Sequence, residues 1–245
     1  MAQKVVYTVL TGGYDRLQQP EVTAPGWDYI CFTDGPAGRE GVWELRPIPY
    51  EGTPLMRARW AKLHPHVLLP EYTLSVFMDA NLCITGTTFY DRCQEAAASG
   101  FAALQHPQRD CVWEELRYCY LKDKLSTRAA LRHYRHLQDM GMPRHAGLYE
   151  TNILLRAHLT PAMVLLDEAW WRALTACCPR DQLTFTTVLR EQPALLFGEG
   201  LNARNVPYVR YTLHPAPSRK KTFWENVSYR LRLWWRKLVL LLCLR

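Results

Sequence analysis

Hydrophobic residues along the chain fall into two kinds of segment. Short runs of β-branched and aromatic residues lack a clean apolar–polar alternation, which is typical of strands buried on both faces of a parallel sheet. Longer segments between them carry apolar residues at helical spacing. Strands that alternate with helices predict an α/β fold with a mostly parallel central sheet and helices on both faces. The predicted strands lie at 5–10, 28–33, 43–48, 74–78, 101–105, 152–156 and 207–211.

The predicted helices follow from helix-forming residues and from breakers. A helix from about Leu55 is interrupted near Pro65, because proline lacks an amide hydrogen and clashes with the preceding turn. The segment "YDRCQEAAASG" predicts a helix that ends at a glycine. Residues 113–141 predict one or two amphipathic helices. Two further helices are predicted in "PAMVLLDEAWWRALTACC" and "DQLTFTTVLREQ".

Charge divides the chain into a neutral part and a basic tail. The 245 residues are 48% hydrophobic, enough for one large domain with a substantial core. The formal net charge is +7, and residues 219–245 carry all of it, with eight basic residues and one acid. Residues 1–218 therefore sum to zero, which disfavours a basic groove for nucleic acid. We expect one domain over 1–218 and a tail over 219–245.

The tail combines tryptophan, leucine and basic residues. Its longest uncharged apolar run, 238–244, is far shorter than the ~20 residues that a membrane span needs. This composition is typical of a helix that lies on an anionic membrane surface. The alternative is a terminal helix packed on the domain or in a dimer interface.

Cysteine usage and the N-terminus both favour a cytosolic protein. None of the eight cysteines forms a Cys-x-x-Cys pair, and several lie in apolar runs. We therefore expect reduced, mostly buried thiols and no structural zinc. A strand-like run follows directly after Lys4, so no export signal is expected.

Three of the predicted strands end in residues that could contact a ligand. Gly12 and Gly13 end the first strand and allow positive φ and a close approach to a bound group. In "SVFMDANLCI", Asp79 and Asn81 follow a strand and place two oxygen donors where they could meet one divalent cation. His214 ends a later strand and is a candidate third ligand. The alternatives are ordinary turns and a structural histidine.

Other polar groups are candidates for binding or proton transfer. Arg59 and Lys62 share one helical face, either toward phosphate oxygens or toward solvent. Glu150, Thr151 and Asn152 stand at the mouth of a short strand. Asp181 begins a helix, where an acid also complements the helix dipole. The segment "HPQRDCVWEE" contributes a further polar cluster with His106, Arg109 and Glu114, for which surface polarity is the alternative.

Eight ordered segments together resemble a known family. They are "YTVLTGGYD", "DYICFTD", "RARWAKLHPHVLLPEY", "FMDANLCI", "HPQRDCVWEE", "GMPRHAGLYETNILLR", "AWW" and "RDQLTF". They resemble the glycosyltransferase-like domain family of the plant mucilage-related and turgor-regulation proteins, which has many bacterial members. The wider resemblance is to GT-A glycosyltransferases. It implies a single GT-A, Rossmann-like domain.

The resemblance implies a donor site for a nucleotide-diphosphate sugar, with UDP-sugars favoured. Asp34 would meet the base or ribose. The loop that would cradle the nucleotide comprises Thr11, Gly12, Gly13 and Tyr14.

The resemblance also implies groups that handle the diphosphate. Mn²⁺ or Mg²⁺ would be held by Asp79, Asn81 and His214. Asn81 stands where an acid is usual, so a weak or dispensable metal is expected. Negative charge on the diphosphate would also be stabilised by Arg59, Lys62 and Lys220.

The resemblance leaves the stereochemistry open. An inverting reaction needs a carboxylate base, for which Asp181 is the first choice and Glu150 the second. A retaining reaction would place Gln182 near the anomeric carbon. The expected acceptor-binding residues are His106, Arg109, Glu114, Asn152, Trp170 and Trp171.

The sequence thus favours a transferase that adds a sugar to a cell-surface glycan of lipopolysaccharide or capsule type. The enzyme would work in the cytoplasm, peripherally on the inner membrane of a bacterium, with a nucleotide sugar and a lipid-linked glycan as partners. One alternative is a metal-dependent hydrolase with His106, His214 and Asp79 as ligands. Another is a nucleotide-sugar-binding module without catalysis.

Overall fold

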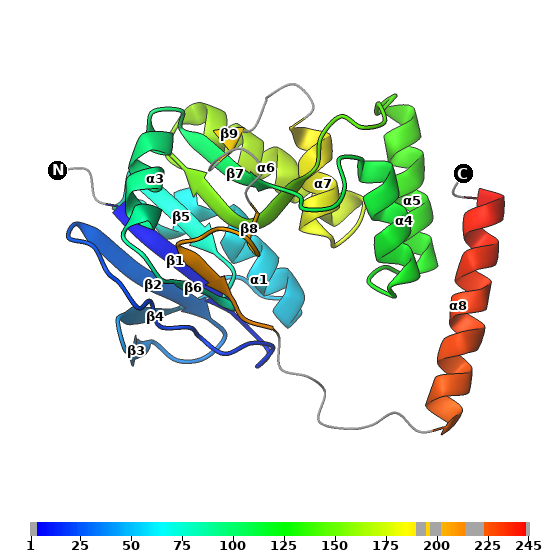
Figure 1. The fold of residues 1–245 in the computed structure, drawn as a ribbon, viewed down its shortest axis with the longest axis horizontal. Coiled ribbons are helices and arrows are strands. Elements are labelled where there is room, and N and C mark those ends of the chain that lie inside the picture. The colour runs from blue at the N-terminus through cyan, green and yellow to red at the C-terminus, as the bar shows by residue number, and fades with distance from the viewer. Residues whose placement is uncertain (1–3, 190–194, 197–201, 214–222, 244–245) are drawn as a thin grey trace.

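An eight-stranded sheet runs through the computed structural model, which describes residues 4–189, 195–196, 202–213 and 223–243 (Figure 1). The strand order is β3-β4-β2-β1-β5-β8-β7-β9. The strands are β1 (Lys4–Leu10), β2 (Trp27–Thr33), β3 (Gly38–Glu40), β4 (Trp43–Pro47), β5 (Leu74–Met78), β7 (Phe101–Gln105), β8 (Tyr149–Arg156) and β9 (Leu195–Leu196).

Most strands of this sheet run in one direction, as the sequence predicts. β1 pairs in parallel with β2 and β5, and β2 pairs in parallel with β4. β8 runs antiparallel between β5 and β7. The carboxyl ends of β1, β2, β5 and β7 therefore share one edge with the amino end of β8. Ligands of open α/β sheets bind at such an edge.

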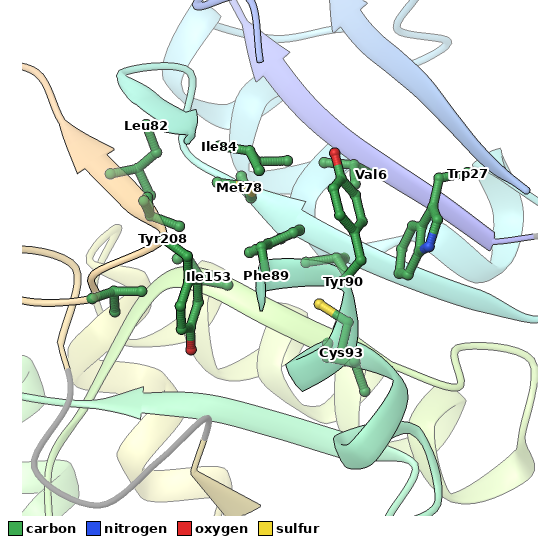
Figure 2. Packing of buried hydrophobic residues seen from close by; sticks show 14 of the residues in the cluster. Val6, Trp27, Met78, Leu82, Ile84, Phe89, Tyr90, Cys93, Ile153 and Tyr208 are labelled. Carbon is green, nitrogen blue, oxygen red and sulfur yellow. The ribbon is translucent and has the colours of Figure 1, made fainter. Parts of the chain in front are cut away.

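Alternate side chains of the strands feed two separate cores. Val5 and Tyr7 pack on the face covered by α1 (Pro54–Leu63) and α6 (Pro161–Ala176). Val6 packs on the other face with Phe89 and Tyr90 of α3 (Thr88–Ala97), as Figure 2 shows. A small ribbon of β6 (Leu82–Ile84) and β10 (Val209–Tyr211) adds to that second face. Helices cover both faces, as the sequence predicts.

A third core lies beside the sheet and is built from helices alone. It joins α4 (Val112–Leu121), α5 (Thr127–Asp139) and the C-terminal α8 (Phe223–Cys243) (Figure 1). α7 (Asp181–Val188) connects this core to the sheet, because Leu183 packs into the helical core and Phe185 packs under the sheet. The first residue of α7 is thereby fixed between two cores.

The element predictions differ from the structure mainly at short or edge segments. The break near Pro65 is confirmed, since α1 ends at Leu63 and α2 (Pro65–Leu68) follows. Residues 113–141 form two helices, not one. The predicted strand 207–211 pairs only with β6, outside the central sheet, and the short strands β3, β6 and β9 were not predicted. The proposed boundary at 218/219 lies outside the described residues.

The cysteines are free thiols, as the sequence predicts. Seven of the eight are buried and Cys243 is exposed. No helix of the described chain is both long enough and apolar enough to cross a membrane.

A buried ion pair ties the sheet to its helices. Arg156 at the end of β8 and Asp167 of α6 are both 0% exposed, and Arg156 Nη1 donates to Asp167 Oδ1 at 2.7 Å. Arg156 Nη2 donates to the carbonyl oxygen of Lys62 at 2.7 Å and also to the Tyr7 hydroxyl. That hydroxyl in turn donates to the same Lys62 carbonyl at 2.8 Å. One guanidinium thus links β1, α1, α6 and β8.

Replacing Arg156 tests this linkage. The Arg156→Met variant leaves the Asp167 carboxylate buried without a cation, so we expect the free energy of unfolding to fall by about 3–5 kcal/mol. Urea denaturation measures it. The exposed pair of Arg92 and Glu95 provides the control, and Arg92→Met is expected to cost about 0–1 kcal/mol. A loss no larger than in this control would contradict the role of the buried pair.

Candidate functional site at the carboxyl edge of the sheet

The loop after β1 is held at the sheet edge by its neighbours. Thr11 Oγ1 donates to the carbonyl oxygen of Pro54, at the start of α1, at 2.9 Å. Gly12 N donates to Asp34 Oδ2 at 2.8 Å. Gly12 and Gly13 have φ of +63° and +61°, and a Cβ on Gly12 would lie 3.1 Å from Pro54. A side chain at position 12 would therefore be strained by both the positive φ and the contact with Pro54. The side chain of Tyr14, in the same loop, is 69% exposed.

Asp181 is the centre of a buried charge cluster. Its Oδ2 accepts hydrogen bonds from Lys62 Nζ at 2.6 Å, Arg59 Nη1 at 2.8 Å and Thr151 Oγ1 at 3.0 Å. Lys62 and Asp181 are buried, with side chains 2% and 5% exposed. The structure thus brings together Arg59 and Lys62 of α1 with the first residue of α7, although 119 positions separate Lys62 from Asp181. Thr151 of β8, which the sequence places at the mouth of this strand, completes the cluster, although its contact with Asp181 was not predicted.

The charges in this cluster shift one another's proton affinities. Burial alone would raise the pKa of Asp181, but Arg59, Lys62 and Arg180 outweigh burial and hold it well below its usual range. Burial lowers the pKa of Lys62, and the charges of Asp181 and Asp79 oppose that shift. Asp181 is therefore a firmly ionised anchor for three cations.

Asp79 and Asn152 lie opposite each other on β5 and β8. Asp79 N donates to the carbonyl oxygen of Asn152 at 2.9 Å. Burial raises the pKa of Asp79, and Lys62 opposes the rise. The side-chain Oδ1 of Asn152 is buried without a protein partner. Asp79, directly after β5, and Asn152 of β8 are thus paired through the backbone, and each carries a side chain with hard oxygen donors.

The predicted metal ligands fit a divalent cation only in part. Asp79 and the amide oxygen of Asn152 are donors that Mg²⁺ or Mn²⁺ accepts, and a bound diphosphate would have to supply further oxygens. Asn81 Nδ2 is occupied by the carbonyl oxygen of Thr212 at 2.9 Å. Within the described ranges no group of three or more His, Cys, Asp or Glu residues is placed to hold a metal. His214 and Lys220 lie outside the described residues.

Glu150, the second residue of β8, contacts Ala203 and Arg204, a segment that the sequence analysis did not place at the site. Its Oε2 accepts from Ala203 N at 2.8 Å, and its Oε1 accepts from Arg204 Nη1 at 3.3 Å. Asn152 also hydrogen-bonds to this carboxylate. Burial nonetheless raises the pKa of Glu150. A buried carboxylate with a raised pKa is the kind of group that can take up a proton.

His106 lies at the end of β7 in a compact polar cluster. Its Nδ1 accepts backbone hydrogen bonds from Gln108 at 3.2 Å and Arg109 at 3.0 Å. Its Nε2 faces Arg109 Nη2 at 3.2 Å, and Arg109 Nε donates to Glu115 Oε2 at 2.6 Å. Burial lowers the pKa of His106 to about 4, so its ring is neutral at pH 7. Nδ1 is thus occupied as an acceptor, and Nε2, which then carries the ring proton, lies 3.8 Å from Glu115 Oε2.

Two of the expected acceptor residues need correction. Glu114 points to solvent, whereas the neighbouring Glu115 is buried and binds Arg109. Trp170 is 0% exposed, its Nε1 donates to the Asp181 carbonyl at 3.0 Å, and its ring lies 4.3 Å from Phe185. Trp170 therefore supports α7 from below and offers no face to a sugar.

Trp171 remains partly exposed. It packs edge-on against Tyr50 and His64, with ring centroids 5.6 Å and 5.4 Å apart. The ring thus belongs to an aromatic group at the outer side of α1.

Several polar atoms around Asp181 are buried without a protein partner. They are Arg59 Nε, Asn152 Oδ1, Arg180 Nε and Gln182 Nε2. Buried polar atoms are almost always hydrogen-bonded in folded proteins, so such a group indicates water or a bound polar ligand. Arg59 binds Asp181 directly, and Asn152 follows Thr151, which also binds it. Arg180 and Gln182 flank Asp181 in the sequence.

The pH dependence of stability tests the anchoring role of Asp181. Its folded pKa lies below the unfolded value of about 3.9, so its stabilising effect is complete above that pH and is lost as the pH falls. We expect Asp181→Asn to be less stable than wild type at pH 7, because Lys62 then lacks its partner. The gap should shrink below about pH 4 by up to about 1.4 kcal/mol per pH unit.

Urea denaturation between about pH 7 and about pH 3 measures this gap. Asp139→Asn, on the exposed end of α5, is the control and should run parallel to wild type. A gap for Asp181→Asn that does not depend on pH would contradict the anchoring role.

Comparison with known proteins gives one family and a larger set of similar solved structures, including two glycosyltransferases. The first fold is the apo structure of the WbbM bifunctional glycosyltransferase, at 12% identity and a TM-score of 0.48, over 80% of this chain and 38% of that one. The second is the apo form of mouse xyloside xylosyltransferase 1, at 12% identity and a TM-score of 0.46, over 80% of this chain and 84% of that one. The chain thus spans well under half the length of the first structure. No curated protein matches it.

Residues 35–195 match the family described as TOD1/MUCI70, glycosyltransferase-like domain. The resemblance seen in the sequence motifs is confirmed, and the matched region contains β5, β8 and the Asp181 cluster. Because the match spans more than half of the 245 residues, the chain belongs to the TOD1/MUCI70 glycosyltransferase-like domain family.

Proposed function

We propose that the protein transfers a sugar from a nucleotide-diphosphate donor bound at the carboxyl edge of the sheet. One observation carries this proposal: three cations, Arg59, Lys62 and Arg180, surround Asp181 at that edge beside buried polar atoms without protein partners. Lys62 and Arg59 also act on the buried carboxylate of Asp79, whose pKa they lower against the effect of burial. Preorganised positive charge of this kind stabilises a leaving diphosphate.

The β1 loop supplies the nucleotide side of the proposed site. Gly12 and Gly13 leave room for a close approach to the backbone, and the Tyr14 side chain, which is 69% exposed, would cover a base. Asp34 holds the Gly12 amide in this conformation and would meet the ribose or base. UDP-sugars are the favoured donors, following the family resemblance.

Proton transfer in this proposal falls to Glu150 and not to Asp181. A general base works best when its pKa lies near the working pH. The pKa of Asp181 is held far below that range, whereas burial raises the pKa of Glu150. In a retaining reaction no protein base would be needed at this point; Gln182 would lie near the anomeric carbon, and its buried Nε2, which has no protein partner, would donate to an oxygen of the donor sugar.

A divalent cation has a supporting place in the proposal. Asp79 and the side-chain oxygen of Asn152, together with the expected ligands Asn81 and His214, would hold Mn²⁺ or Mg²⁺, which when bound neutralises charge on the diphosphate. The neutral Asn81 amide and the nearby cations make this requirement weak.

The proposed acceptor is a lipid-linked glycan of lipopolysaccharide or capsule type at the cytoplasmic membrane face. His106 and Arg109 at the end of β7 and Asn152 on β8 lie at the same sheet edge as Asp79 and would contact it. The hydrolase alternative would need His106 as a metal ligand. The contacts of its two ring nitrogens with Arg109 do not favour that role.

A thermal-shift panel with UDP-, GDP-, CMP- and dTDP-sugars tests the donor proposal. A ligand that binds only the folded state raises the Tm by mass action. We expect one nucleotide class to raise the Tm of wild type, and Asp79→Ala to lose any additional shift caused by Mn²⁺. Stabilisation by metal alone, with no response to any nucleotide, would overturn the proposal. Nucleotide binding without sugar release or transfer would identify a non-catalytic binding module.

Glu150→Gln tests the assignment of the base. The amide cannot accept the acceptor proton, so we expect kcat to fall by about 10²- to 10⁴-fold while the nucleotide-dependent Tm shift is retained. Glu95→Gln, on the exposed face of α3, is the matched control and should keep wild-type turnover. Full activity in Glu150→Gln together with a large loss in Gln182→Ala would instead favour the retaining reaction.

A further inference from the structure

The C-terminal helix α8 is docked on the domain by one of its faces. Val239 and Leu240 of α8 are buried in the helical core with α4 and α5. Arg236 lies on the same face, and its Nη1 donates to the carbonyl oxygens of Tyr120 at 2.6 Å and Leu125 at 2.8 Å. Its guanidinium lies 4.6 Å from the centre of the Tyr120 ring. The charged Arg236 side chain thus points toward α4 and not toward the exposed apolar face of α8.

The opposite face of α8 carries a row of large apolar side chains. Leu231 and Trp234 are each 64% exposed, Trp235 is 55% exposed and Leu242 is 66% exposed. At the helical rotation of about 100° per residue, these four side chains fall within an arc of about 100° that faces away from Arg236. We name these four residues the exposed stripe.

Basic residues border the exposed stripe on both sides. Arg230 and Lys237 follow one border and Arg232 lies beyond the other, and all three are exposed. Residues 228–243 contain no acid. From the sequence alone the charges of the tail spread over a broad arc. The structure separates them into one docked arginine and three cations that border an apolar face.

We propose that α8 lies flat on an anionic lipid bilayer, with the exposed stripe inserted between the head groups. Tryptophan and leucine are the side chains that enter this region, while flanking arginine and lysine contact anionic head groups. A second copy of the chain fits less well, because pairing two such faces would bring their basic borders together. The proposal depends on the geometry of α8 and not on the donor chemistry.

Flotation of the full-length protein with lipid vesicles tests this assignment. Vesicles of phosphatidylcholine with phosphatidylglycerol should carry wild type, and vesicles of phosphatidylcholine alone should carry much less. Trp234→Ser combined with Trp235→Ser should abolish flotation. Arg230→Gln combined with Lys237→Gln should weaken binding to the anionic vesicles by about 25-fold, at about fivefold for each charge removed. Added salt should weaken wild-type binding in the same direction.

Matched controls separate the stripe from general surface properties. Leu165→Ser removes a 68%-exposed leucine from α6, and Arg39→Gln with Arg92→Gln removes two exposed charges at β3 and α3, at the other end of the molecule from α8 (Figure 1). These variants should bind vesicles as wild type does. Thermal unfolding without lipid establishes that every variant is folded.

Two outcomes would overturn the proposal. In one, the folded double tryptophan variant floats as well as wild type. In the other, wild type does not bind vesicles and sediments as a dimer that the same variant dissociates. The flotation assay contains no nucleotide sugar. Failure to bind vesicles therefore does not contradict the proposed transferase function, and binding to vesicles does not support it.

Discussion

The architecture of the site depends on one buried carboxylate oxygen. Asp181 Oδ2 accepts hydrogen bonds from α1 through Lys62 and Arg59, and from β8 through Thr151. The Lys62 carbonyl is held from the other side by Arg156 and Tyr7. Lys62 is therefore fixed at both its backbone and its ammonium group. Burying so many charges is costly unless each is paired, so the arrangement is more easily explained by a functional role than by a gain in stability.

This interaction also decides what Asp181 can do. A carboxylate that neutralises three cations is a weak base, because its proton affinity is reduced by the same charges that it fixes. The carboxylate in turn holds the three cations in place before a ligand arrives, so little reorganisation is needed when negative charge develops. Asp181 and Glu150 are both buried acids. Burial acts to raise the pKa of both, so the opposite direction of their shifts follows from the charged groups around them.

The sequence predicted those features that depend on local pattern. The bounds of β5 and β7 and the helix break at Pro65 follow from apolar runs and proline, which act over a few residues. The antiparallel direction of β8 and the contact between Lys62 and Asp181 arise from tertiary packing, which periodicity does not encode. Glu114 and Glu115 lie on different sides of α4. Cys119, one helical turn after Glu115, is buried and contacts it, so an apolar residue at that spacing could have indicated that Glu115 faces inward. Trp170 and Trp171 likewise point to different sides of α6, which the dipeptide alone does not reveal.

The same packing connects the proposed membrane face to the proposed site. Arg236 fixes α8 to the turn after α4, and α4 shares its core with Leu183 of α7. Arg180, directly before α7, is influenced by Glu115 and Cys119 of α4. The exposed stripe and Asp181 are thus related through α4 and α7, which share one core with α8. A bilayer bound to the stripe would therefore present the sheet edge to a membrane-held acceptor in a fixed orientation, and its distance from the surface would limit which acceptors reach Glu150.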